Sequence, residues 1–278
     1  MKYQRLHWCV YLLALVAMIP CRINAETSCD DGNGPLNTAQ PANITPQQII
    51  QKFAAKEAIF KEARDHYTYT EEIVVQTLDG GTVDGEFRQK LDILYDDQGN
   101  RIEQVTYAPE PTLTRIILSP QDWSDFRHRL PFVLTSEDLP QYDISYVGQQ
   151  HVDELDTYVF DVGPRKIEKS KRYFKGRIWV DNRDLQIVKT CGRNVPDIHK
   201  RGSENLTPKF VTYRQQVDGQ YWFPTYTMAD DILHFRSGDV HVREILKYTN
   251  YKRFGVKTRI VFGKPVPDAV PQQPPKQP

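Results

Sequence analysis

The stretch Tyr158-Val-Phe-Asp-Val-Gly-Pro164 decides the fold, together with Gly176-Arg-Ile-Trp-Val-Asp181 and Leu185-Gln-Ile-Val-Lys-Thr190. In the first stretch, bulky apolar residues occupy every second position from Tyr158 onward, which is typical of a β-strand with two different faces. Turn-forming residues separate the second stretch from the third, so residues 176–190 predict a β-hairpin. Strands of this kind form a surface, and such a surface favours binding over catalysis.

The N-terminus has the pattern of an export signal. Lys2 and Arg5 precede the apolar run Trp8–Ile19, which is short for a membrane span. We predict a signal peptide over residues 1–25, cleaved near Ala25, and therefore a mature protein in the periplasm. A signal anchor is the alternative interpretation. A lipoprotein signal at Cys21 is disfavoured, because the residues before it are not small.

The charge of the mature chain argues against nucleic acid as a partner. Removal of residues 1–25 takes away three basic residues and no acidic ones, so the formal charge changes from +0 to −3, with 33 basic against 36 acidic residues. A mildly acidic protein is a poor candidate for non-specific nucleic-acid binding. No second hydrophobic run of membrane-spanning length follows the leader, so we expect a soluble mature chain.

Two cysteines remain after processing, Cys29 and Cys191. An oxidising compartment permits a disulfide between them, but Cys29 lies beside a polar, glycine-containing stretch, and two unpaired thiols are the other possibility. Their wide separation does not match the ligand spacing of a metal site.

The chain is predicted to form one domain with two loose ends. Residues 26–45 are rich in Asn, Gly, Pro and Thr, and we interpret them as a flexible lead-in. Residues 46–263 form the predicted domain, because no Pro/Gly cluster and no internal repeat divides them. Residues 264–278 are Pro-rich and predict a disordered, extended tail.

The domain opens with a predicted helix over residues 46–65. Thr45 is suited to cap it, with proline in the first helical position, and Ile49, Ile50, Phe53 and Phe60 fall on one face. Glu57 falls on the same face and interrupts the apolar surface. Such a helix either covers one side of a sheet or acts as a lid over a cavity, and its sequence alone does not decide between them.

After this helix the sequence predicts a meander of roughly ten mostly antiparallel strands, an α+β fold that is mainly β. Gly80-Gly81 and Asp218-Gly219 mark hairpins, and residues 119–130 predict a short inserted helix capped by Ser119. The predicted strands cover residues 71–79, 82–95, 101–107, 142–150, 157–162, 172–181, 185–190, 210–217 and 220–228, followed by a last hairpin around residues 233–242.

The last hairpin suggests a register. If Ser237-Gly238 is a two-residue turn, Phe235 faces Val240 and Leu233 faces Val242, which places two apolar pairs on one face. The same register places two histidines, at positions 234 and 241, opposite each other. We interpret them as exposed polar residues rather than zinc ligands, because the neighbouring arginines repel a cation.

Catalytic signatures do not occur in this sequence. There is no Gly-x-Ser-x-Gly elbow, no His-Glu-x-x-His pair and no phosphate-binding Gly-rich loop. The adjacent acids Asp153-Glu154 and Asp230-Asp231 are typical of turns and surfaces. We therefore expect a protein that is not an enzyme and that uses no metal and no cofactor.

The leader, the helix followed by strands, and the motifs Tyr158-Val-Phe-Asp-Val162 and Arg177-Ile-Trp-Val-Asp181 resemble the periplasmic outer-membrane lipoprotein-sorting family (LolA-like). Leu185-Gln-Ile-Val-Lys189 and Tyr221-Trp-Phe-Pro224 also resemble later strands of that family. The resemblance covers roughly residues 46 to 255 in layout. This chain departs from the family in its Pro-rich tail and in the basic loop Arg165–Arg172.

The resemblance implies a strongly curved antiparallel sheet, a half-open barrel, closed by the N-terminal helix and the short inserted helix. It further implies a carrier that holds the acyl chains of lipids or lipoproteins in the apolar concave face, with envelope proteins as donor and acceptor. The alternatives are an ordinary filled core and an envelope sensor or protein-interaction domain on the same fold. The residues that we expect on the apolar face are Leu91, Ile93, Tyr95, Tyr158, Phe160, Ile178, Val180, Leu233, Phe235, Val240 and Val242.

Overall fold

The computed structural model describes residues 27–254, except residues 31, 97, 121, 124–131, 169–170 and 201–202. The predicted signal peptide and the predicted Pro-rich tail lie outside these residues. The described chain forms one long helix and a ten-stranded antiparallel sheet, so the prediction of a mainly-β fold is confirmed. Among the described residues, no helix combines the length and the apolar character that a membrane span needs.

The elements follow the predicted order, except for an unpredicted hairpin between residues 198 and 205. Their bounds are α1 Pro46–Arg64, β1 Tyr67–Asp79, β2 Thr82–Tyr95, β3 Arg101–Tyr107, η1 Leu139–Gln141, β4 Tyr142–Val152, β5 Leu155–Pro164, β6 Tyr173–Asp181, β7 Ile187–Val195, β8 Ile198–Lys200, β9 Ser203–Asn205, β10 Phe210–Val217, β11 Tyr221–Phe235 and β12 Gly238–Arg253.

Helix α1 begins at the predicted cap. The Thr45 hydroxyl accepts the backbone N–H of Gln48 at 3.2 Å, and the Gln48 side chain accepts the backbone N–H of Thr45 at 2.9 Å. This reciprocal capping box satisfies two N–H groups that have no partner inside the helix. Ile49, Phe53 and Phe60 are fully buried, which fixes the face that α1 turns towards the sheet.

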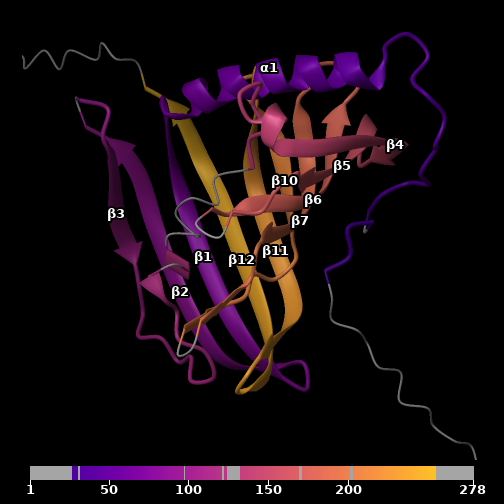
Figure 1. Cartoon of the computed structure of the whole chain (residues 1–278). Coiled ribbons are helices and arrows are strands. Elements are labelled where there is room, and N and C mark those ends of the chain that lie inside the picture. Colours follow the sequence, from indigo (N-terminus) through magenta and orange to yellow (C-terminus); the bar gives the residue numbers. More distant parts are fainter. Residues whose placement is uncertain are drawn as a thin grey trace, which may run out of the picture.

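The sheet order is β3-β2-β1-β12-β11-β10-β7-β6-β5-β4, and β8 pairs with β9 in a separate hairpin. The last strand, β12, therefore lies between β11 and β1 in the middle of the sheet (Figure 1). The expected half-open barrel is not found in this form, because the sheet neither closes nor curls strongly. β3 and β4 remain its two separate edges.

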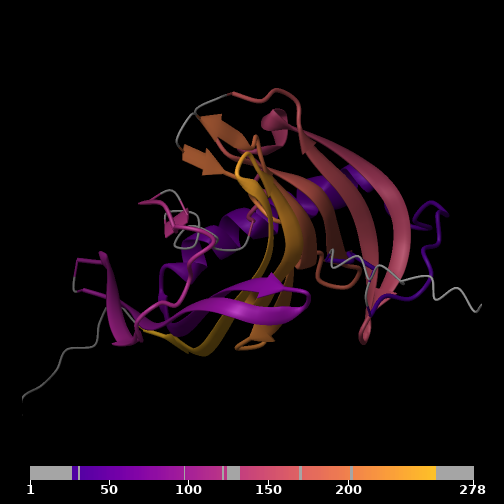
Figure 2. The ribbon, with the colours of Figure 1, turned by 90° about the horizontal axis from the view of Figure 1, so that it is seen from below.

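Helix α1 and the described residues of the connection between β3 and β4 cover one face of the sheet, which we call the inner face (Figures 1 and 2). Ile50 and Ala54 of α1 pack on strands β5 to β7, and Leu113 and Ile116 of the connection pack on β1, β2 and β12. The opposite face, which we call the outer face, carries a smaller apolar cluster around Trp179.

The predicted short helix is only partly described. Residues 120, 122 and 123 are helical, whereas residue 121 and residues 124–131 lie outside the described part. Ser119 caps this turn as predicted, since its hydroxyl accepts the backbone N–H of Asp122 at 3.2 Å and its own N–H donates to the Asp122 carboxylate at 2.7 Å.

The described residues of the lead-in, 27–45, form an ordered strap. Cys29 and Cys191 are joined by a disulfide bond, with their Cα atoms 5.5 Å apart, which fixes the strap to the outer face. Asn33 and Asn37 then form β-bridges with β4, and the backbone of Asn37 exchanges two hydrogen bonds of 2.8 and 2.7 Å with Gln149. From there the chain leads to α1 on the inner face, so the strap passes around the β4 edge.

Candidate functional site

The eleven residues expected on the apolar face all lie on the inner face. Directly opposed residues of an antiparallel pair point to the same side of a sheet, so the strand registers define which residues share a face. One row across seven strands connects Phe160, Ile178, Thr190, Thr212, Thr227, Leu246 and Ile73. Ile73 is also opposite Gln89, which extends the row to β2. Each of the other expected residues lies an even number of positions from the row on its own strand, so its side chain points to the same face.

The inner face carries two separate apolar patches, however, and not one. The α1 patch consists of Tyr158, Phe160, Ile178 and Val180 on β5 and β6, and α1 lies over it. The rings of Phe53 and Phe160 meet edge to face, with their centroids 5.9 Å apart. Phe160, Ile178 and Val180 have no exposed surface, and Tyr158 is half-buried.

The second patch lies under the β3–β4 connection, and we call it the connection patch. It contains the other expected residues, Leu91, Ile93, Tyr95, Leu233, Phe235, Val240 and Val242. Leu113, Ile116, Leu118 and Trp123 pack against it, and the Trp123 ring lies 4.8 Å from that of Phe87, centroid to centroid. Both patches are therefore covered, the α1 patch by α1 with Phe132 and Leu134 of the connection, and the connection patch by residues 113–123.

A polar band separates the two patches. Thr190, Thr212 and Thr227 are buried side by side on β7, β10 and β11, and the hydroxyls of Thr212 and Thr227 are 2.9 Å apart. Each hydroxyl in such a band needs a hydrogen-bond partner, so the band resists occupation by a continuous apolar chain. An apolar ligand would therefore occupy one patch rather than run across both.

A buried ion pair joins α1 to the sheet beside this band. Both N–H₂ groups of Arg214 on β10 donate to the Glu57 carboxylate, at 2.9 and 3.2 Å, and Arg214 also donates to the carbonyl of Phe132 at 2.6 Å. Both side chains are 1% exposed. Burial raises the pKa of Glu57, and the charge and hydrogen bonds of Arg214 oppose that effect. The pair explains why an acid interrupts the apolar face of the helix.

A second buried acid lies at the connection patch. Burial raises the pKa of Glu71 on β1 to about 7, although Arg101 on β3 is 3.9 Å away and lowers it. Burial also raises the pKa of the neighbouring Tyr69 to about 12. This end of the inner face, near the C-terminus of α1, therefore holds ionisable groups in a mostly apolar setting.

The hairpin register predicted for residues 233–242 is wrong by two residues. Leu233 pairs with Val240 and Phe235 with Gly238, so the tight turn is Arg236-Ser237. A slip by two residues keeps every side chain on its own face, and for that reason the apolar pattern could not detect it. Gly238, with φ of 128°, occupies a backbone conformation that glycine adopts easily.

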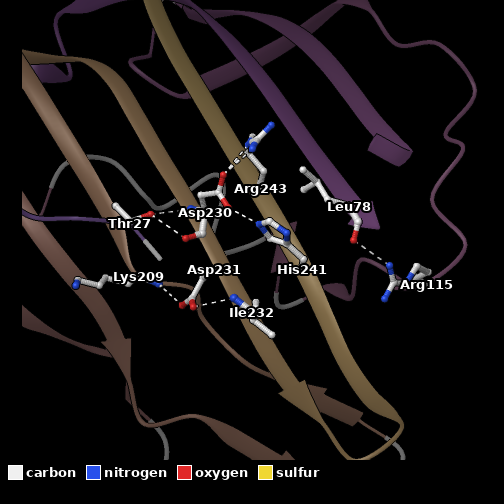
Figure 3. A network of polar contacts seen from close by, with 9 residues as sticks. All are labelled: Thr27, Leu78, Arg115, Lys209, Asp230, Asp231, Ile232, His241 and Arg243. Carbon is white, nitrogen blue, oxygen red and sulfur yellow. Dashed lines mark hydrogen bonds and ion pairs between the residues drawn. The ribbon is translucent and has the colours of Figure 1, made fainter. Parts of the chain in front are cut away.

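The two histidines consequently do not face each other. His234 contacts Asp239, with Nδ1 2.8 Å from the carboxylate, and His241 contacts Asp230 (Figure 3). Asp230 also accepts from Arg243 at 2.8 Å, and its backbone N–H donates to the Thr27 hydroxyl at 2.7 Å. The network thus holds the start of the strap on the outer face. Among the described residues, no group of three or more His, Cys, Asp or Glu side chains is arranged to hold a metal ion.

Sequence reasoning located the inner face but missed its polar partners. Glu57 was visible as an interruption of the helix, and Arg214 alternates with Phe210 and Thr212 on β10. A paired signal of this kind, one acid on an apolar helix face and one base on an apolar strand face, could have identified the ion pair. The threonine band had no comparable signal, because threonine is also a common strand residue.

No family model matches this chain, and no curated protein matches it. Solved structures do match. A DUF1329 family protein from Desulfovibrio piger is 16% identical with a TM-score of 0.38, and the match covers 75% of this chain and 93% of that one. A LolA superfamily protein from Nitrosomonas europaea is 14% identical with a TM-score of 0.31, covering 72% and 94%.

The MucA/MucB complex structure from Pseudomonas aeruginosa matches with 9% identity and a TM-score of 0.21, covering 72% of this chain and 100% of that one. The LolA superfamily, which the sequence resembles, is therefore among the structural matches. At these identities and TM-scores the likeness is remote, and it carries no argument about what this chain binds.

Proposed function

We propose that this chain is a periplasmic carrier that holds the acyl chains of lipids or lipoproteins against the inner face. In this proposal it contributes to outer-membrane lipoprotein sorting, with envelope proteins as donor and acceptor. In this proposal the chain binds its cargo without covalent chemistry and without a cofactor. The disulfide between Cys29 and Cys191 is consistent with export to an oxidising compartment.

The observation that carries the proposal is the α1 patch. Its apolar side chains are covered by α1, with Phe132 and Leu134 of the β3–β4 connection beside it, rather than by a second sheet. Side chains link the helix to the sheet: Glu57 accepts from Arg214 on β10, and Lys56 donates to the carbonyl of Asp184 in the turn between β6 and β7. A cover held in this way can be displaced without breaking the hydrogen-bond ladders of the sheet.

Exchange of one apolar cover for another makes the binding reversible. Displacement of α1 exposes Ile49, Phe53 and Ala54 together with the patch below them. An acyl chain restores about 0.8 kcal/mol for each methylene that it buries on the patch. The free energy gained when the acyl chain is buried and the free energy lost when the helix moves both come from apolar surface. They therefore partly offset each other, which suits a protein that must take up and release its cargo.

A fluorescent fatty-acid titration tests the proposal. We expect the mature protein to bind the probe, and Tyr158→Glu to weaken binding at least about tenfold, because a charge in an apolar site is costly. Tyr158 is half-buried, so the variant is expected to fold, which circular dichroism checks. Met228→Glu is the matched control, since Met228 is half-buried in the outer-face cluster. Failure of the unmodified protein to bind, or equal losses in both variants, would refute the carrier.

A second candidate, a protein-interaction or sensor domain, is favoured by the β3 edge. Ile102, Val105 and Tyr107 on this edge strand are 45%, 50% and 52% exposed. An edge strand with exposed apolar side chains offers free backbone groups and contact surface to an added strand. If the titration gives no binding to the unmodified protein, this candidate replaces the carrier.

A further inference from the structure

The α1 patch opens at the β4 edge, through a cleft that we call the mouth. The mouth has a volume of about 250 Å³ and lies between the first turns of α1, the short helix η1 and the first residues of β4. The strap crosses β4 farther along, at Gln149 and Val152, so its bridges lie away from the mouth.

The floor of the mouth is apolar and continues into the α1 patch. Ile50 belongs to the cluster of buried side chains under α1, and Leu139 and Ile144 pack against that cluster. Ile144 is directly opposite Val162 on β5, which lies two positions from Phe160 of the α1 patch. An acyl chain that enters through the mouth therefore reaches the α1 patch over a continuous apolar surface.

The rim of the mouth carries hydrogen-bond donors. Gln47 and Gln51 are exposed and lie one turn apart on α1, so both amides are on the same side of the helix. Arg165, the first residue of the basic loop 165–172, lines the mouth from the end of β5. Among the described residues that line the mouth, Arg165 alone has a charged side chain.

Contacts of its Nε atom hold Arg165 in place. This atom donates to the carbonyl of Tyr142 at 3.0 Å and lies 3.1 Å from the carboxylate of Asp143. Within the described part of the chain, the two terminal NH₂ groups of Arg165 make no hydrogen bond, and the side chain is 59% exposed. Asp143 offsets the charge of Arg165, so the mouth offers directed donors rather than a surplus of positive charge.

We propose that the mouth binds the carbonyl-bearing head of an acyl chain, a carboxylate or an ester, while the tail lies on the α1 patch. This inference rests on the proposed carrier function and names the chemical class of its cargo. Carbonyl and carboxylate oxygens only accept hydrogen bonds, and a guanidinium only donates them. The amides of Gln47 and Gln51 can donate to the same head, whereas a cationic head offers no acceptor and is repelled by Arg165.

Calorimetric titration of the mature protein compares ligands that share one alkyl chain: dodecanoate, its glycerol monoester and dodecyltrimethylammonium. We expect dodecanoate to bind at least about tenfold more tightly than dodecyltrimethylammonium, because only the first accepts hydrogen bonds. The monoester distinguishes the sources of the head: equal affinity with dodecanoate indicates an acyl ester as cargo, and weaker binding indicates a free fatty acid. Equal affinity of all three ligands would overturn this inference and leave the carrier standing, whereas binding of none would overturn both.

The decisive variant is Arg165→Met. We expect it to weaken dodecanoate binding at least about tenfold and to leave dodecyltrimethylammonium binding unchanged. Arg236→Met is the matched control, since Arg236 is 62% exposed and lies 3.8 Å from Glu204 in another part of the surface. It should leave the affinities of all three ligands unchanged.

Gln51→Ala is a second variant, on the other side of the mouth. Alanine favours the helix, so this variant is expected to fold, and circular dichroism checks both variants. We expect weaker binding of dodecanoate and of the monoester. If Arg165→Met and Gln51→Ala both keep the affinities and the selectivity of the unmodified protein, the head does not bind in the mouth, although the α1 patch still holds the tail.

Discussion

At the scale of single residues, buried polar side chains determine how this chain is held together. Gln150 on β4 shows the principle: its carbonyl oxygen accepts the indole N–H of Trp179 at 2.8 Å, and its amide donates to the carbonyl of Gly34 in the strap at 2.8 Å. Lys189, which is 1% exposed, donates to Asn33 in the same strap at 2.8 Å. Each of these side chains forms a hydrogen bond with a polar group that would otherwise be buried and unpaired.

The ion pair between Glu57 and Arg214 makes a residue-scale prediction. Arg214→Met leaves the Glu57 carboxylate buried without its counter-charge, so we expect it to lower the free energy of unfolding by about 3–5 kcal/mol. The double variant Glu57→Leu with Arg214→Met removes both charges and is expected to recover most of that loss. Urea unfolding followed by circular dichroism measures both.

Arg88→Met is the matched control for this pair. Arg88 contacts Glu72 at 3.8 Å, and its side chain is 40% exposed, so we expect a loss of less than about 1 kcal/mol. If the double variant were as unstable as Arg214→Met alone, the unpaired charge would not be the cause of the destabilisation.

Glu71 makes a prediction about pH. Burial raises its pKa to about 7, above the ordinary glutamate value of 4.5, so the folded protein holds this proton more tightly than the unfolded chain does. The resulting stabilisation is complete below pH 4.5 and is lost as the pH rises through 7, by about 3 kcal/mol in total. Glu71→Gln should therefore have little effect at pH 4.5 and increase the free energy of unfolding, relative to the unmodified protein, above pH 7. A difference that does not change between these pH values would contradict the assignment.

At the scale of elements, the strap and α1 form one continuous clamp. The chain is bound to the outer face at Cys29, passes the β4 edge at Asn37, and reaches the inner face as α1, whose other end leads directly into β1. The approach to the edge is close, because a Cβ atom at Gly148 would lie 2.4 Å from the carbonyl oxygen of Asn37. Helix α1 is thus tethered at both ends, and any movement over its patch is a tilt or a shift.

The disulfide is the strongest link of this clamp, and its removal is the element-scale prediction. It joins residues 162 positions apart, so it restricts the unfolded chain considerably. We expect Cys29→Ala with Cys191→Ala to lower the free energy of unfolding by about 2–5 kcal/mol. A reductant should have a similar effect on the unmodified protein and none on the double variant. Equal stability of the oxidised and reduced proteins would show that the strap is held by its hydrogen bonds alone.

At the scale of the whole molecule, local sequence signals predicted the helices and strands, but they did not predict which distant strands pair. The cap at Thr45 and the glycine turn at residues 80–81 placed α1, β2 and the end of β1 correctly, but β1 begins at Tyr67, four residues before its predicted start. The pairing of β12 with β1 joins segments that are far apart in sequence, and no local pattern in either strand predicts it. Whether the sheet stays open or closes into a barrel likewise depends on the packing of all strands together.

The candidate site was predictable to the same extent. Alternation along each strand identified the side chains of the inner face, because a strand repeats every two residues. It could not show that three threonines from different strands meet in a buried band, since their meeting depends on registers between strands.

The central position of β12 has a consequence for the order in which the protein is assembled. Among the described residues, β12 alone joins strands β1 to β3 to the part of the sheet that β4 to β7, β10 and β11 form, and it begins about 160 residues after β1 ends. A chain delivered with its N-terminus first therefore exposes an unpaired edge of β1 until its last strand arrives, and such an edge is prone to wrong pairing. A chain that stops before β12 forms two half-sheets rather than one shorter sheet.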